Sequence, residues 1–122
     1  MPAESDHVAQ ARRNARFLAG IDLQPPAQCC DWAVTVAFYT ALHLVEAEFA
    51  RRNRHCTSHP KRNSEVSLHL GAIESDYLLL YMASRRARYN CVQITPEAAR
   101  QVLQDNYDPV RVHVCNLLGV QL

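Results

Sequence analysis

Histidine and arginine recur here at spacings that suit phosphate chemistry. Arg54 and His59 lie in NRHCTSHPKRN (53–63), where Arg62 adds a further cation and no acidic residue occurs. The stretch has no apolar periodicity and contains a proline, so we predict an exposed basic loop. Arginine holds phosphate, and histidine transfers protons near neutral pH. Arg54 and His59 are therefore the candidate catalytic pair for RNA cleavage through a ribose 2′-hydroxyl, and Arg62 a candidate phosphate ligand.

A second group of cations ends a later predicted helix. The sequence SRRARY (84–89) supplies Arg85, Arg86, Arg88 and the ring of Tyr89. Arginines bind phosphates, and a tyrosine ring stacks on a base. We predict a phosphate- or RNA-binding surface here. The alternative is a solvated helix end whose cations only complement the helix dipole.

Two other kinds of chemistry are less favoured. His55, Cys56 and His59 offer three zinc ligands within five residues, but no second pair of ligands completes a structural site. Cys29 and Cys30 open an apolar helix and suit packing better than nucleophilic catalysis. The sequence therefore predicts no metal and no cofactor.

Bulk properties limit the remaining classes. The chain has 122 residues, is 48% apolar and carries a net charge of +1. Its length favours one domain spanning 1–122, and its net charge by itself does not point to a nucleic-acid partner. No charge-free apolar run reaches the length of a membrane span, and the N-terminus lacks a signal-peptide core. With an odd number of cysteines, we expect reduced thiols and a cytoplasmic protein.

Residues 31–52 form the segment that must position these groups. Their polar side chains fall on one narrow strip of a helix, whereas a surface helix needs only an apolar stripe. We therefore expect this helix at the centre of a bundle, with Phe38 and Leu42 buried. The strip consists of Asp31, Thr35, Tyr39, His43 and Glu46.

Other helices follow from apolar spacing and from start and stop signals. Ser64 is the expected cap of a short helix, Thr95 caps the last helix, and a kink is expected near Asp108. No segment alternates as a strand does. The fold class is all-α, an antiparallel bundle of four long helices and one short helix. Their ranges are Glu4–Ala19, a segment after Pro25–Pro26 running to residue 52, 65–70, 73–88, and 96 to about 117.

Three segments together resemble the HEPN family of helical domains. They are DWAVTVAFYTALHLVEA (31–47), HCTSHPKR (55–62) and YLLLYMASRRARY (77–89), and the similarity extends over about residues 15–118. The resemblance implies an antiparallel bundle of four or five helices, commonly a homodimer. It also implies RNA or nucleotide binding and, in many members, metal-independent ribonuclease activity in defence or toxin–antitoxin systems.

The family's active motif, an arginine, a polar residue and then a histidine, matches Arg54 and His59 in spacing. Other members are non-catalytic modules that bind a partner protein, so an interaction module is the alternative function, and an antitoxin is one expected partner. In an antiparallel bundle the 73–88 helix ends near Asp31, far from the 53–63 loop. We therefore expect one shared site only across a dimer cleft.

Overall fold

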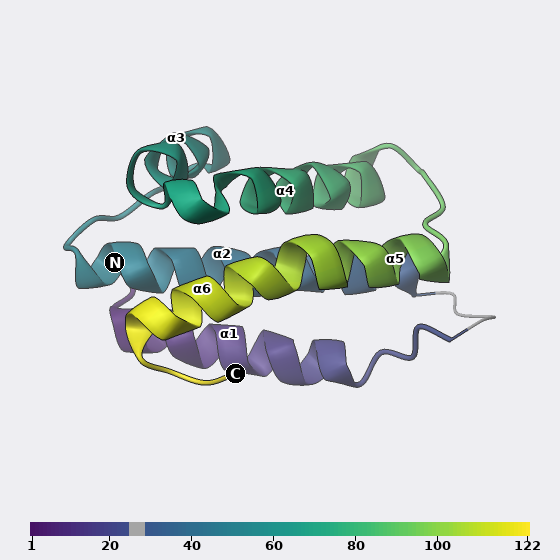
Figure 1. Ribbon diagram of the computed structural model, residues 1–122, viewed down its shortest axis with the longest axis horizontal. Helices are drawn as coiled ribbons and strands as arrows, with labels where there is room; N and C mark the ends of the chain where they lie inside the picture. Colours follow the sequence, from purple (N-terminus) through teal and green to yellow (C-terminus); the bar gives the residue numbers. More distant parts are fainter. Residues whose placement is uncertain (25–28) are drawn as a thin grey trace.

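The structure, a computed structural model, describes residues 1–24 and 29–122, so Pro25–Pro26 lie outside the described part. Figure 1 shows a bundle of antiparallel helices, and the described residues contain no strand. The predicted bundle of four long helices and one short helix is confirmed, since α5 continues into α6 through a π-helical turn, Leu103–Tyr107. The α-helices are α1 (Glu4–Ala19), α2 (Cys30–Arg51), α3 (His59–His69), α4 (Glu74–Tyr89), α5 (Pro96–Val102) and α6 (Asp108–Leu118).

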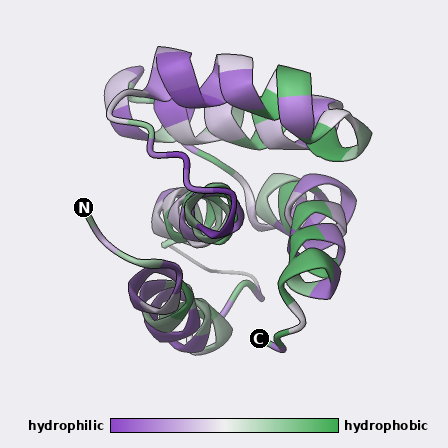
Figure 2. Cartoon of the chain, turned by 90° about the vertical axis from the view of Figure 1, so that its left-hand side faces the viewer, coloured by the Kyte–Doolittle hydropathy of each residue, from purple (hydrophilic) through white to green (hydrophobic). Residues whose placement is uncertain are grey.

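Helix α2 is the centre of the bundle, as predicted. Figure 2, which looks along the bundle, shows other helices around it. Phe38 is fully buried and Leu42 nearly so. By length and hydropathy alone α2 passes as a membrane span, but most of it is buried inside the protein, as in the core helix of a bundle. Trp32 is the large exception, with 61% of its surface exposed.

Burial of α2 within one chain removes one argument for a dimer. We expected α2 to keep more apolar surface than its neighbours cover, and that expectation is wrong, because α1, α4, α5 and α6 all pack on it. The homodimer itself stays a prediction.

Helix α3 begins six residues earlier than expected. Its cap is Ser58, whose hydroxyl accepts a hydrogen bond from the Lys61 amide at 3.3 Å, and not Ser64. We took Pro60 as a loop residue, but proline is compatible with the first turn of a helix, where its missing N–H has no partner to lose. His59 is therefore the first residue of a helix.

The later helices follow the predicted signals. Thr95 caps α5 by accepting from the Ala98 amide at 3.1 Å. The predicted break in the last helix is the π-helical turn that ends just before Asp108. Pro109 lacks the N–H that would bond to the carbonyl of Asp105, and a π turn accommodates that missing bond.

The segment after α2 folds back along the bundle. Residues 52–58 return toward the middle of α2, and α3 then runs across the bundle axis (Figures 1 and 2). As a result, the ring of His59 lies 5.7 Å from that of Phe38, in the first half of α2.

Candidate functional site

A buried ion pair lies on the interior side of His59 and fixes its position. Arg62 donates from Nε to Glu46 at 2.5 Å, and both residues are buried. The same guanidinium contacts Nδ1 of His59 at 3.2 Å and the Cys56 carbonyl at 3.4 Å. Each of the three guanidinium nitrogens of Arg62 makes one of these contacts, and the residue is buried, so it positions His59 and is not available to a ligand.

Aromatic rings connect His59 to the end of α4. The His59 ring lies 5.5 Å from the ring of Tyr81 and 6.5 Å from that of Tyr39. Arg85 donates to the Tyr81 hydroxyl at 3.1 Å, and Arg88 donates to the Tyr39 hydroxyl. We call the whole set the His–Arg cluster: Tyr39, His59, Tyr81, Arg85, Arg88 and Tyr89.

The cluster forms within a single chain. The guanidinium carbon of Arg88 lies 5.2 Å from the centre of the Tyr39 ring and 5.1 Å from that of Tyr89. We expected His59 and the end of α4 to meet only across a dimer, and the structure corrects this. The chain returning between α2 and α3 brings His59 to the middle of the bundle, within reach of long arginine side chains from α4.

Besides Arg62, which supports His59 from the interior, two predicted site residues lie outside the cluster. Arg54 forms an ion pair with Glu65 at 3.2 Å and has no hydrogen bond to His59. Arg86 lines a small pocket with Val92 and Ile94, on another face of α4. Arg54 and His59 therefore do not contact each other despite their spacing. The arginine that contacts His59 is Arg62, and Arg88 reaches the neighbouring Tyr39.

Sequence reasoning missed Tyr39 and Tyr81 as parts of the site. Tyr39 belongs to the polar strip of α2, so the strip was a usable signal. Of the strip, Tyr39 lies near His59 and Arg88, whereas His43 contacts His7 of α1.

The cluster carries positive charge that no carboxylate offsets. Among the described residues, neither Arg85 nor Arg88 has an ion-pair partner, and their hydrogen bonds go to tyrosine hydroxyls and to Ser84. By contrast, Arg51, Arg52 and Arg54 are all paired with glutamates. Such a site favours an anion, and a planar guanidinium suits phosphate oxygens.

His59 presents an N–H group to this site. Its pKa is lowered by burial and by the nearby charges of Arg62, Arg88 and Arg85, so the ring is neutral at pH 7. Arginine has only donors, so Nδ1 of His59 must accept from Arg62 and the ring proton sits on Nε2. His59 is therefore a hydrogen-bond donor toward a ligand and is poorly prepared to act as a general base.

The loop cysteine differs in burial from its two histidine neighbours, of which His55 is exposed and His59 half-buried. Cys56 is buried, and burial raises its pKa, as does the charge of Glu46. No group of three or more histidine, cysteine, aspartate or glutamate side chains gathers in the described part of the chain.

A separate histidine pair joins α1 to α2. His7 and His43 contact through their Nδ1 atoms at 3.0 Å. Burial lowers the pKa of both rings, and that of His43 reaches about 4. Both rings are thus neutral at pH 7, and one donates to the other.

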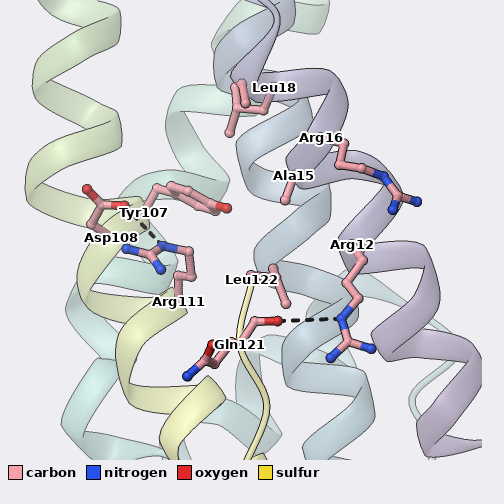
Figure 3. Close-up of a pocket in the computed structure, with 10 residues that line it drawn as sticks. Arg12, Ala15, Arg16, Leu18, Tyr107, Asp108, Arg111, Gln121 and Leu122 are labelled. Carbon is pink, nitrogen blue, oxygen red and sulfur yellow. Dashed lines mark hydrogen bonds and ion pairs between the residues drawn. The ribbon is translucent and has the colours of Figure 1, made fainter.

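A large cavity lies away from the cluster. It measures about 620 Å³ and separates α1 from the π-helical turn and α6 (Figure 3). Arg111, bound to Asp108 at 3.2 Å, and Arg12, which donates to the Gln121 carbonyl, lie at its edge. Tyr107, whose pKa burial raises to about 12, closes one side. Arg12 and Arg16 line the cavity as well, but it holds one aromatic ring and no histidine, so it lacks the combination of donors and rings found in the cluster.

The His–Arg cluster is thus the candidate site: two unpaired cations, one N–H donor and three tyrosine rings. It has the donors to bind a phosphodiester and the rings to hold a base. No protein-family model matches the chain, and no curated protein is detectably similar to it.

Proposed function

We propose that the protein binds RNA by its phosphates at the His–Arg cluster, as a HEPN-like protein acting in a defence or toxin–antitoxin setting. The observation that carries the proposal is the pair Arg85 and Arg88, which have no carboxylate partner among the described residues and are bonded to the two tyrosines whose rings lie near His59. The resemblance of residues 31–47, 55–62 and 77–89 to the HEPN family supports RNA as the polyanion.

The test measures binding of a short fluorescent single-stranded RNA by anisotropy across a series of salt concentrations. The double variant Arg85→Ala/Arg88→Ala removes two phosphate contacts, so the slope of log K against log salt should flatten by about 1.4 units. The matched control is Arg12→Ala/Arg16→Ala, which removes the same charge from the cavity side of α1. Equal slopes in both double variants would contradict the proposal.

Cleavage is a separate question with its own test. Because Arg62 occupies Nδ1 of His59, we expect the wild-type protein to bind RNA without cutting it. Metal-free incubation with labelled RNA checks this directly. Cleavage by the wild type that disappears in His59→Ala would show that His59 acts as a catalytic base or acid, and would reject the donor role.

One observation favours the rival function, a non-catalytic protein-interaction module. Leu79 and Met82 lie one turn apart on α4 and are 53% and 58% exposed. Exposed apolar patches often mark protein interfaces. If the RNA test fails and Leu79→Glu/Met82→Glu abolishes self-association, the module is the better description.

A further inference from the structure

A groove between α1 and α2 adjoins the His–Arg cluster. It measures about 370 Å³ and is lined by Gln10 and Asn14 from α1 and by Trp32, Val36, Tyr39 and His43 from α2. This volume falls in the range of roughly 300–1,000 Å³ that small-ligand pockets occupy. The groove lies on the other side of α1 from the 620 Å³ cavity, which Arg12 and Arg16 line.

Tyr39 belongs to both the groove and the cluster. Its ring lines the groove, and its hydroxyl accepts a hydrogen bond from Arg88. When a ligand binds Arg88 through a phosphate, the ligand atoms attached to that phosphate therefore lie next to the groove.

Trp32 is exposed at this groove although it stands on the most buried helix. Its indole is 61% exposed, whereas the flanking Ala33 and Val34 are fully buried. An indole gives a large flat surface with few rotamers, which suits stacking on a base.

The groove is uncharged and mostly apolar, unlike the cluster, with a few polar groups at its lining. The Gln10 amide nitrogen donates to the Asn14 side-chain oxygen at 2.9 Å, which leaves the Asn14 amino group free to donate. His43 is neutral at pH 7 and bonded to His7. Cations at one end and an aromatic ring with amide groups at the other match the two parts of a nucleotide.

We infer that RNA binds this protein as a single strand, with one base stacked on Trp32 in the α1–α2 groove and the adjoining phosphate on Arg88. The inference rests on the proposed function and specifies its substrate, because the bases of a duplex are already stacked on one another and are not available to an indole.

The chain's only tryptophan makes the test direct. Oligouridylate should quench the Trp32 emission with the same midpoint as its anisotropy curve, and the matched RNA duplex should leave the emission unchanged. Trp32→Ala should weaken single-strand binding by about 5- to 100-fold, since stacking on one base is worth that much. Its salt slope should equal that of the wild type, because no phosphate contact is lost.

Two variants serve as controls. Trp32→Phe keeps a stacking ring and should recover much of the affinity. Leu68→Ala removes an exposed apolar side chain from α3, far along the chain from the groove, and should bind as the wild type does. Sedimentation of the wild type and Trp32→Ala is run alongside.

The outcomes separate the two claims. If the wild type binds no RNA, the proposed function fails and the inference fails with it. If binding responds to Arg85→Ala/Arg88→Ala while Trp32→Ala binds normally and the emission is unquenched, only the inference is overturned. If Trp32→Ala changes the sedimentation of the protein, Trp32 belongs to a contact with a second copy, and the stacking role is overturned.

Discussion

At the scale of single residues, Arg62 and Arg54 are two arginines of the same segment with opposite environments. Arg62 is buried against buried Glu46, whereas the Arg54 side chain is 47% exposed beside Glu65. Removing one partner of a buried pair leaves a charge without compensation in the interior. The stability of the two variants should therefore differ widely.

We predict that Arg62→Ala lowers the free energy of unfolding by about 3–5 kcal/mol. Arg54→Ala, the matched control, should cost less than about 1 kcal/mol because its ion pair is exposed to solvent. Urea unfolding followed by circular dichroism measures both. Similar losses in the two variants would mean that the Arg62–Glu46 pair is hydrated and not buried.

The His7–His43 pair makes stability depend on pH. In the folded protein the pKa of His43 is about 4, below its unfolded value of 6.5, because of burial and then the charges of His7, Arg62 and Arg13. The pKa of His7 is lowered by burial, while Glu46 and Asp6 oppose the change and Arg62 and His55 add to it. Between these values the unfolded chain binds more protons than the folded one, so stability rises with pH.

We therefore predict that the free energy of unfolding falls as pH drops from about 6.5 to about 4, by roughly 1–2 kcal/mol after allowance for the partial exposure of His43. Unfolding curves in urea at several pH values check this. His43→Leu should remove most of the decline. The control His113→Gln, on α6, should show the same dependence of unfolding free energy on pH as the wild type. If the free energy of unfolding still falls at low pH in His43→Leu, groups other than His43 cause the fall.

At the scale of elements, the apolar spacing of the sequence predicts most helix bounds but not the start of α3. Helix α1 matches the prediction. The observed ends of α4 and the C-terminal end of α2 each differ from the predicted ends by one residue. Each of these helices has a clear apolar pattern over several turns. Helix α3 is short and mostly polar, so its start depends on one cap, and Ser58 and Ser64 are equally good caps by type. The structure selects Ser58 because His59 and Val66 then pack inward.

The cap of α3 is testable by a matched pair of serines. Ser58→Ala removes the acceptor for the Lys61 amide and should lower the free energy of unfolding by about 1 kcal/mol. Ser64→Ala lies inside α3, where alanine is the better helix former, so it should be neutral or slightly stabilising. Thermal unfolding of both variants decides. A larger loss for Ser64→Ala would restore the cap predicted from the sequence.

Pattern alone predicts the composition of the site better than its contacts. The side-chain types of the basic and aromatic residues near 59 and at 85–89 are enough to predict that they belong to a phosphate-binding site. The Arg88–Tyr39 contact joins residues 49 apart and depends on α2 and α4 lying side by side. The position of His59 depends on the path of residues 52–58, for which the sequence has no periodic signal.

At the scale of the whole molecule, the exposed surface of α4 bears on self-association. The resemblance to HEPN domains predicts a homodimer, and Leu79 and Met82 form an exposed apolar pair on α4. We expect a dimer in sedimentation velocity at tens of micromolar, and Leu79→Glu/Met82→Glu should convert it to a monomer. A wild-type monomer at that concentration would contradict the prediction, and Leu68→Glu on α3 controls for a general effect of added charge.

The nearly all-round apolar surface of α2 also matters while the chain is being made. On the ribosome, α2 emerges after α1 but before the α4, α5 and α6 segments that cover its other sides. The nascent chain must therefore expose the apolar surface of α2 until α4, α5 and α6 have been made. Ribosome-bound chains that stop near residue 90 should recruit chaperones or aggregate, and chains that also include α6 should do so less once released.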